Sequence, residues 1–500
     1  MSRTKSAFLG TISSQVYAVI AILISLFSLP IIVHHLNPEI YGLSIIIFQI
    51  TSYLGLFDFG LTAGVERYLA GTKTDSSENR EIVKKIICTS LVVYIIFALC
   101  ILLSGSIFAI YSNHLFKVPA KYDVRYIVMV VSIVLALQTI LRAITGIFFA
   151  HQRQLLSNTL SFVLNFSNSV IVVVLVLLDY GLWSFAYAQV IVFIITAVLN
   201  LYYFRKYYSY VEFNLKYYDF KLIKEMFKYG YSVFMIGVSA QIIFQTDRIL
   251  VGYFVSLTAV TIYSVTTRLP ELTTQFLWKI TDNAFPGIVE TVKNNKQALI
   301  KIHDDLMNIT ISLSVMAFWY IAVVSQPFIK LWVGESYFVG NIFLFSITYL
   351  YLIQHTVIHV TAMCLSAAGI VKRLSVVYFI EAMLNIVISI ILVKKYGTLG
   401  VIYGTIISGL ITSAWFTPFL AINYMQSTLI KYLYAIVKPL TVATVTGFIL
   451  YLIFDKLFIG VNGWLMLILY SLVFLILSAL PFVYFNKQLI QSLLNKVKNN

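Results

Sequence analysis

Five polar side chains fall on one face of an otherwise apolar stretch between residues 259 and 289. Steps of three, four, four and three residues separate them, which is the spacing of one face of an α-helix. They are Arg268, Glu271, Gln275, Lys279 and Asp282. Because a charge at the centre of a bilayer costs roughly 2.5–3.5 kcal/mol on insertion scales, this stripe needs water, substrate or charge pairing beside it. Two interpretations stay open: a substrate-binding cavity lining, or an internal ladder of ion pairs, Arg268–Glu271 and Lys279–Asp282.

Further basic and amide side chains lie in apolar stretches outside that stripe. Arg142 has no acid beside it, and an intramembrane arginine of this kind is a functional candidate. Arg248 shares a helix face with Gln241 and Gln245, and either lines a cavity or lies at the outer interface. The cavity interpretation gives five candidate substrate-binding residues: Arg142, Arg248, Arg268, Gln275 and Lys279.

Five acids are candidates for binding a coupling ion or for a structural role: Asp58, Asp247, Glu271, Asp282 and Glu381. Asp58 precedes Gly60 in a stretch that resembles the broken end of a helix, so both roles stay open for it. Glu381 shares a helix face with Tyr378 and Asn385, a pattern that more often joins helices than binds substrate. The coupling ion would be H⁺ or Na⁺, and no other cofactor is expected.

The sequence carries no pattern that is typical of an enzyme or of a metal site. His355 and His359 are four residues apart, but no third ligand of fixed spacing accompanies them. Cys88, Cys100 and Cys364 fall inside apolar stretches and offer neither a metal-binding spacing nor a disulfide framework. No nucleophile elbow or phosphate-binding loop occurs. We therefore expect neither catalysis nor a bound metal.

The elements that carry these residues follow from composition. The chain of 500 residues is 60% hydrophobic and only 11% charged, with a mean hydropathy of +0.90, whereas soluble proteins carry about 25% charged residues. Its apolar blocks have the length, about 20 residues, at which a helix crosses a hydrocarbon core of about 30 Å. The predicted fold class is therefore an all-α polytopic membrane protein with about fourteen transmembrane helices. Their approximate bounds are 10–33, 40–62, 86–111, 126–149, 158–179, 182–204, 229–255, 259–289, 306–330, 339–366, 375–393, 399–423, 433–454 and 463–485.

The net charge of +15 has an explanation that does not involve nucleic acid. If the N-terminus lies inside, most Lys and Arg residues outside the spans fall in inward segments, as the positive-inside rule requires. This distribution predicts that both termini are cytoplasmic. The lipid bilayer is the expected surrounding, and no nucleic-acid partner is expected.

An internal repeat predicts how the spans are grouped. Residues 153–165 match residues 373–385, and the turns that follow open with Tyr180-Gly181 and Tyr396-Gly397, all at an offset of about 220 residues. Spans one to six would then repeat as spans seven to twelve, and an even-numbered unit makes the repeats parallel. We expect two parallel six-helix lobes around a central cavity, plus two extra C-terminal helices. The predicted bounds are 1–205 for the N-terminal lobe, 206–228 for a cytoplasmic linker with a short amphipathic helix, 229–425 for the C-terminal lobe, 426–486 for the extra helices and 487–500 for a cytoplasmic tail.

Three short motifs resemble those of a known family. They are Leu56-Phe57-Asp58-Phe59-Gly60-Leu61 running to Glu66-Arg67-Tyr68, then Gln245-Thr246-Asp247-Arg248-Ile249-Leu250-Val251-Gly252, and then Ile262-Tyr263-Ser264. Together they resemble the polysaccharide transporter family of the multidrug/oligosaccharidyl-lipid/polysaccharide exporters. The best-known members of that family are bacterial flippases of O-antigen and capsule repeat units. The resemblance covers the chain from the first span to about residue 425.

The resemblance implies transport of a polyprenyl-diphosphate-linked oligosaccharide from the inner to the outer leaflet of the bacterial inner membrane, by alternating access. It also implies a polysaccharide polymerase and chain-length proteins as further partners. Basic residues in a cavity suit the anionic diphosphate, because arginine binds phosphate through two parallel hydrogen bonds. Two alternatives stay open: a cation-coupled multidrug exporter of the same fold, which would need an acid-dominated cavity, and a non-transporting scaffold of a polysaccharide assembly complex, which would need no charges at membrane depth.

Overall fold

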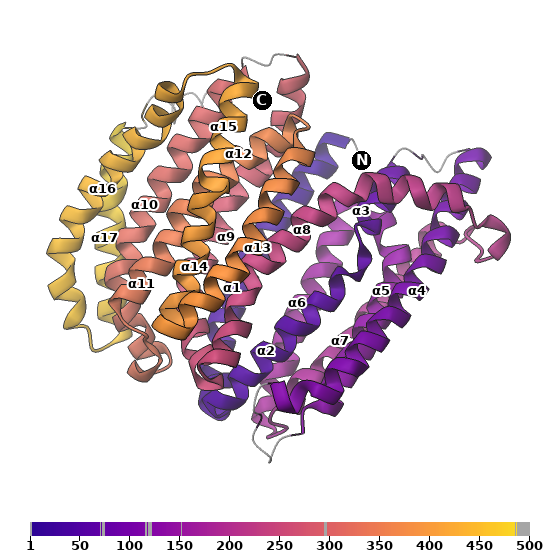
Figure 1. Cartoon of the computed structure of the whole chain (residues 1–500), viewed down its shortest axis with the longest axis horizontal. Coiled ribbons are helices and arrows are strands. Elements are labelled where there is room, and N and C mark those ends of the chain that lie inside the picture. Colours follow the sequence, from indigo (N-terminus) through magenta and orange to yellow (C-terminus); the bar gives the residue numbers. More distant parts are fainter. Residues whose placement is uncertain are drawn as a thin grey trace. The chain divides into compact units, whose positions relative to one another are not determined.

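Helices make up nearly all of the part of the chain that the structure describes. The computed structural model describes residues 3–70, 72, 76–115, 118, 123–151, 153–294, 298–485 and 487, and no β-strand occurs within those ranges (Figure 1). The first helices are α1 (Arg3–His35), α2 (Pro38–Leu54), η1 (Gly55–Asp58), α3 (Leu61–Ala70), α4 (Ser77–Leu115), α5 (Arg125–Ala150), α6 (Gln154–Leu177), α7 (Trp183–Tyr208), η2 (Leu215–Tyr217) and α8 (Phe220–Phe254). The remaining helices are α9 (Leu257–Asn294), α10 (Ala298–Trp332), η3 (Glu335–Tyr337), α11 (Asn341–Thr348), η4 (Tyr349–Gln354), α12 (His355–Ala367), α13 (Val371–Tyr396), α14 (Thr398–Ile411), α15 (Ser413–Met425), α16 (Leu429–Ile459) and α17 (Trp464–Phe485).

Twelve segments of the described chain are helical, long and apolar enough to cross a membrane. They do not include α1, whose described apolar part is the shorter stretch Val19–His35, or α9, which carries the polar stripe. These two helices lie at the two remaining predicted spans, so each predicted span coincides with a helix or with consecutive helices. The prediction of an all-α, multi-pass membrane protein is confirmed.

The chain divides into two compact units, which are described separately. The first unit comprises Met1–Gln241 with Ser256–Val260, and the second comprises Ile242–Val255 with Thr261–Asn500. Residues 220–228, expected within an amphipathic linker helix, form the first turns of α8, which continues without interruption to Phe254.

In the first unit, α3, α4 and α5 pack around a core of aromatic and branched side chains. Tyr94, Ile147 and Phe148 are each at most 1% exposed in this core. The 39 residues of α4 span about 58 Å at 1.5 Å per residue, whereas the hydrocarbon layer is about 30 Å thick. The polar first turns of α4, residues 77–85, therefore extend beyond the apolar part of the helix.

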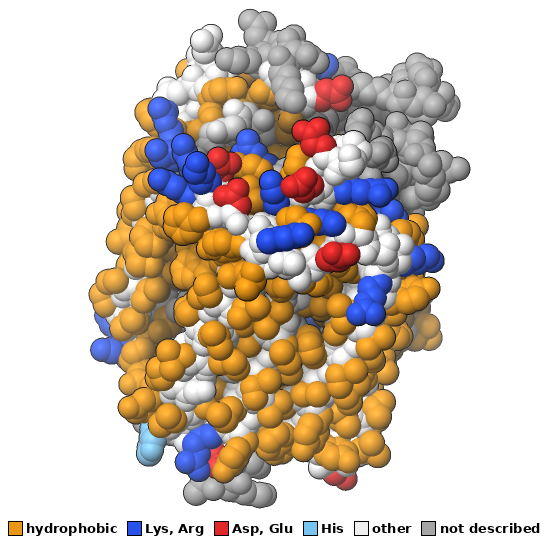
Figure 2. Space-filling view, turned by 90° about the vertical axis from the view of Figure 1, so that its right-hand side faces the viewer, with side chains coloured by type: hydrophobic (Ala, Val, Ile, Leu, Met, Phe, Trp, Pro, Cys, Tyr) orange, Lys and Arg blue, Asp and Glu red, His pale blue; other side chains and the backbone are white. Residues whose placement is uncertain are grey.

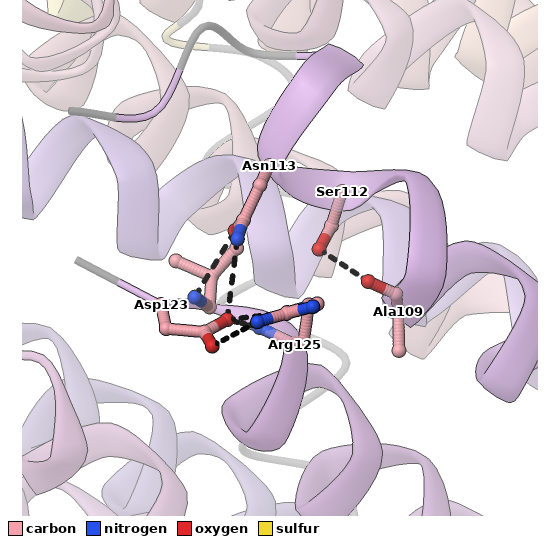
Figure 3. Close-up of polar contacts among 6 residues, drawn as sticks. Ala109, Ser112, Asn113, Asp123 and Arg125 are labelled. Atoms are coloured by element: carbon pink, nitrogen blue, oxygen red, sulfur yellow. Dashed lines mark hydrogen bonds and ion pairs between the residues drawn. The ribbon is translucent and has the colours of Figure 1, made fainter. Parts of the chain in front are cut away.

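A polar clasp joins the ends of α4 and α5 (Figure 3). Asn113 Nδ2 donates to Asp123 Oδ1 at 3.2 Å, and Asn113 Oδ1 accepts from the backbone N–H of Val124 at 3.2 Å. The same Asp123 carboxylate accepts from the backbone N–H of Arg125 at 3.1 Å and pairs with the Arg125 guanidinium at 2.7 Å. These donors, the guanidinium first, hold the pKa of Asp123 well below its usual range, so the clasp stays ionised at neutral pH.

The second span is broken between α2 and α3, as the sequence predicts. Phe59 (φ 47°) and Gly60 (φ 79°) both adopt left-handed backbone conformations directly after η1. A Cβ atom on Gly60 would overlap the carbonyl oxygen of Gly230 on α8, and a Cβ on Gly230 would overlap that of Gly60. The two backbones thus touch at a pair of glycines, and only glycine fits this approach.

Corresponding positions of the predicted repeat share local backbone structure. Gly181 (φ 55°), which follows α6, and Gly397 (φ 58°), which follows α13, are both left-handed. The residues that precede these helices, Arg153 and Ile370, share a φ of −86°, but the predicted repeat pairs Arg153 with Arg373, which lies inside α13. Left-handed glycines are common at helix C-termini because they carry no Cβ penalty. The two turns thus share a left-handed glycine, and the grouping of the spans into two repeated lobes stays a prediction.

In the second unit, α16 packs along α10, and α17 joins them through an aromatic cluster that includes Phe454, Phe458 and Phe474. Two irregularities interrupt its other helices. The π-helix η4 connects α11 to α12, and Thr412 (φ −118°, ψ −90°) separates α14 from α15. Short π-helical segments often occur at functional sites, and both irregularities lie next to polar clusters.

A broad band of hydrophobic side chains covers the face that Figure 2 shows, and Lys and Arg side chains gather along one edge of it. Large apolar side chains on the long helices remain exposed, such as Leu103 at 67% and Val198 at 61%. An apolar surface of this extent is typical of a protein that contacts lipid.

Candidate functional site

α8 and α9 form an antiparallel hairpin with its turn at Val255–Ser256. Residues that are equally far from this turn therefore face each other. Asp247 Oδ2 accepts a hydrogen bond from Tyr263 Oη at 3.0 Å, and Arg248 Nε donates to Ser264 Oγ at 3.3 Å. Hydroxyl groups of α9 thus fix two neighbouring charges of α8.

A buried ion pair joins α8 to the polar stripe of α9. The Arg248 guanidinium pairs with Glu271 Oε1, and only 12% and 10% of these side chains are exposed. Tyr351 of η4 donates a further hydrogen bond to the same oxygen at 3.2 Å. The ladder interpretation named Arg268 as the partner of Glu271, but the partner that the structure shows is Arg248. The reason is geometric: a long side chain from the facing helix reaches the carboxylate across the hairpin.

The second pair of the ladder interpretation, Lys279–Asp282, is not formed either. Asp282 Oδ1 lies 3.1 Å from His359 Nε2, and the His359 ring stacks on Trp278 with 4.2 Å between ring centroids. Among the ion pairs of the described residues, none joins Lys279 to Asp282. The Lys279–Asp282 pairing is therefore wrong, because the carboxylate points to α12 and not along α9.

The other members of the stripe differ in exposure. Gln275 is exposed, whereas Arg268 and Lys279 are half-buried. Lys279 makes no hydrogen bond or ion pair with any other residue that the structure describes. α9 therefore retains a partly buried ammonium group that no described acid neutralises.

A hydroxyl and an amide complete the surroundings of Asp247, which is 6% exposed. Thr405 Oγ1 of α14 lies 3.4 Å from Asp247 Oδ1 and accepts a hydrogen bond from Asn385 Nδ2 of α13 at 2.8 Å. The other amide atom, Asn385 Oδ1, is buried and has no hydrogen-bond partner among the described residues. The carboxylate of Asp247, the hydroxyl of Thr405 and the amide of Asn385 therefore form one chain of contacts, and the amide oxygen at its end is unsatisfied.

Glu381 lies beside the break between α14 and α15. Its Oε2 accepts a hydrogen bond from Thr412 Oγ1 at 3.2 Å, and the residue is 3% exposed. A Cβ on Gly409 would overlap Gln354 Nε2 and would lie 3.3 Å from Glu381 Oε1. The small residue thus leaves room for two polar side chains next to the helix break.

In the first unit, Asp58 and Arg142 both lie at the broken second span. Asp58 Oδ1 accepts hydrogen bonds from the backbone N–H of Thr62 at 3.3 Å and from its hydroxyl at 2.9 Å, and so caps α3. The half-buried Arg142 donates to the carbonyl oxygen of Gly55 at 3.5 Å, which is a long contact. Asp58 therefore stabilises the break, and Arg142 lies against it.

Sequence reasoning missed two contributors to these clusters, Tyr351 and His359 as the partner of Asp282, and it gave no role to Glu66. Glu66 packs against Gly146 of α5, one helical turn from Arg142. Tyr351 has no charged neighbour in the sequence that would single it out. The symmetry of the α8–α9 hairpin about its turn was available from the sequence and would have paired residues 247 and 248 with 263 and 264.

A family model described as "Polysaccharide biosynthesis protein" matches residues 7–292, which is more than half of the chain. The chain belongs to this family. The resemblance of its motifs to the polysaccharide transporter family of the exporter superfamily is thereby confirmed. The matched region contains the Asp58 break, the Arg248–Glu271 pair and the polar stripe of α9.

One curated relative of this family member is a Haloferax volcanii protein named "Probable low-salt glycan biosynthesis flippase Agl15". The two are 21% identical over 226 residues, which are 44% of this chain and 47% of the relative. The chain thus matches about half the length of that protein.

Solved structures share the fold at low sequence identity. The lipid II flippase MurJ in an inward closed conformation is 14% identical, with a TM-score of 0.69 over 96% of this chain and 100% of that chain. An inward-facing multidrug resistance transporter of the MATE family is 14% identical, with a TM-score of 0.64 over 84% of this chain and 99% of that chain. A transporter of the same superfamily from Pyrococcus furiosus gives a TM-score of 0.55 at 15% identity, over 86% of this chain and 98% of that chain. The chain therefore has the fold of these proteins.

Proposed function

We propose that the protein is a flippase, not an enzyme, and that it moves polyprenyl-diphosphate-linked oligosaccharides across a bacterial inner membrane by alternating access. The cargo would be repeat units of the O-antigen or capsule type, carried from the inner to the outer leaflet. The observation that carries this proposal is the family match over residues 7–292. Flippases among the relatives, Agl15 and MurJ, support it. A polysaccharide polymerase and chain-length proteins would then use the product.

The charges of the second unit support an anionic cargo. Glu271 is compensated by Arg248, and Asp282 lies against His359, so neither carboxylate depends on Lys279. The half-buried ammonium of Lys279 is therefore available to a diphosphate, and an arginine such as Arg268 would add two-pronged hydrogen bonds. Gln275, which is exposed on the same helix, would serve sugar hydroxyls.

Energy coupling would use H⁺ or Na⁺ at Asp247. Sodium is a hard cation that favours oxygen ligands, and this carboxylate adjoins the Thr405 hydroxyl, which in turn contacts Asn385, whose Oδ1 is buried and unsatisfied. A transporter that couples Na⁺ here should be stabilised against heat by NaCl but not by KCl, and Asp247→Asn should remove that difference. Equal effects of the two salts, together with a pH-dependent rate that Asp247→Asn abolishes, would assign the site to H⁺.

Reconstitution into sealed vesicles tests the function itself. Vesicles that carry a fluorescent polyprenyl-diphosphate oligosaccharide on both leaflets should expose all of it to an added glycosidase when the protein is present. Only the outer half should be cleaved in vesicles without protein. Protection of the inner half in both preparations would refute flipping.

The same vesicles separate the two alternative functions. The shared fold with a multidrug resistance transporter favours an exporter as the second candidate, which would expel a cationic dye and leave the lipid-linked sugar in place. A scaffold would move neither compound, although its loss from cells would still reduce surface polysaccharide.

A further inference from the structure

A basic groove lies at the N-terminal end of α4 in the first unit. It has a volume of about 750 Å³ and is open to the surface. Its basic and aromatic lining residues are Arg80, Lys84 and Lys85 of α4, Tyr210 of the segment after α7, and Lys216 and Tyr217 of η2. None of these residues belongs to the polar clusters of the candidate functional site.

Two ammonium groups of the groove share one aromatic ring. Lys84 Nζ lies 5.7 Å and Lys216 Nζ 4.9 Å from the centroid of Tyr217. Neither lysine forms an ion pair with another described residue, whereas Lys85 pairs with Glu81 at 3.6 Å. Both positive charges therefore lie beside one ring, and an anion bound there would be attracted by both.

The walls of the groove are held in place by partly buried hydrogen bonds. Thr89, which is fully buried on α4, donates to the carbonyl oxygen of Tyr217 at 3.4 Å and accepts from the backbone N–H of Asp219 at 3.0 Å. Cys88 Sγ lies 3.5 Å from the carbonyl oxygen of Glu212. The lysines are therefore presented by a fixed backbone, which lowers the cost of ordering them around a ligand.

Apolar side chains beside the groove indicate where it lies with respect to lipid. Phe213 and Phe220 flank η2, whose first residue is Leu215, and the three side chains are 53%, 70% and 78% exposed in that order. Exposed apolar residues interleaved with lysines are typical of segments that lie in the membrane interface. The α4 residues that line the groove belong to the polar turns that precede the apolar part of the helix, a position that suits the lipid headgroups.

We propose that this groove binds the phosphate headgroup of an anionic membrane phospholipid. Its positive charge attracts the phosphate. Its tyrosines are of a residue type that is enriched at the interface between membrane and water. The exposed apolar side chains beside the groove would contact the acyl chains. These apolar neighbours favour a lipid over a free anion, which would gain nothing from them. The groove lies outside the candidate functional site, so this ligand is distinct from the transported lipid.

Neutralising the two lysines that share Tyr217 tests the proposal. The full-length protein in detergent would be titrated with short-chain phosphatidylglycerol or phosphatidylcholine, and the bound lipid counted by native mass spectrometry. Each lysine near an anionic lipid surface contributes about 1 kcal/mol, so Lys84→Gln with Lys216→Gln should weaken phosphatidylglycerol binding about 30-fold. Binding of phosphatidylcholine should not change. The pair Lys84→Arg with Lys216→Arg should retain binding, which separates loss of charge from loss of fold.

A matched control is present in the second unit. Lys394 and Lys395, in the last turn of α13, also lie near aromatic rings, at 5.7 Å and 5.2 Å. Lys394→Gln with Lys395→Gln changes the net charge equally and should leave phosphatidylglycerol binding within about twofold. An equal loss in the control would show that only net charge matters, and retained binding in the groove variant would also overturn the proposal. Displacement of phosphatidylglycerol by an equal concentration of inorganic phosphate would assign the groove to a free anion.

Discussion

Replacing Glu271 by glutamine should destabilise the protein more than removing the whole Arg248–Glu271 pair. The substitution keeps the shape of the side chain and lets Tyr351 still donate its hydrogen bond. It leaves the Arg248 guanidinium, whose side chain is 12% exposed, without its carboxylate. The double variant Arg248→Gln with Glu271→Gln removes both charges and strands neither.

The magnitude follows from the burial of the pair. Breaking a buried ion pair by removing one partner costs about 3–5 kcal/mol, because the remaining charge is desolvated and uncompensated. For a folding unit of about 250 residues, 1 kcal/mol shifts Tm by roughly 2–4 °C, so Glu271→Gln should lower Tm by roughly 6–20 °C. The double variant should recover most of that loss, because replacing both charges of a buried pair is often neutral.

Thermal unfolding of the purified protein in detergent measures these differences. Gln275→Ala provides the control, because it removes a polar side chain from the same helix at an exposed position. A Glu271→Gln protein with the Tm of the unmodified chain would refute the buried-pair argument. Transport by the double variant then separates two roles of Arg248: normal flipping means that the pair is structural, and a stable but inactive protein means that Arg248 also binds substrate.

Three further substitutions test other parts of the structure. Gly409→Ala should lower the free energy of unfolding by about 1–3 kcal/mol, measured by thermal unfolding, because the added Cβ overlaps Gln354 Nε2. Asp123→Asn should lower Tm, and the size of this decrease should not depend on pH between pH 8 and pH 5, since the native pKa of Asp123 is held below its usual value. The stability that its ionised form adds is lost only as the pH falls below about 4. Arg142→Gln should change the free energy of unfolding by less than about 1 kcal/mol, because its described hydrogen bond is long at 3.5 Å, while it lowers the flipping rate at least about tenfold.

The membrane spans could be predicted from the sequence because their signal is local. The length and polarity of an apolar block decide whether it crosses a bilayer, and neither property depends on neighbouring helices. The break after Asp58 was equally accessible, since Gly60 directly follows Phe59 and supplies a left-handed conformation. The π-helix η4 has no such local signal, because its six residues contain neither glycine nor proline.

The partners of the charges could not be predicted from the same information. Helical spacing correctly put Glu271 and Asp282 on one face of α9, but the spacing within one helix names only partners on that helix. The actual partners, Arg248 and His359, come from α8 and α12, and they depend on how each helix is rotated about its axis. That rotation is set by packing across the whole unit. A sequence pattern therefore locates buried charges better than it pairs them.

Because Glu271 and Asp282 have partners other than Arg268 and Lys279, Lys279 is not needed as a structural counter-charge. Asp282 is engaged by His359, so Lys279→Gln strands no carboxylate and should change the free energy of unfolding by less than about 1 kcal/mol. If the ammonium binds the diphosphate of the cargo, the same substitution should severely reduce glycosidase access to the lipid-linked sugar in vesicles. Lys279→Arg should preserve part of the activity, because the charge remains although its geometry changes. A Tm loss as large as that of Glu271→Gln would restore the ladder interpretation, and normal flipping by a stable Lys279→Gln protein would refute substrate binding by this residue.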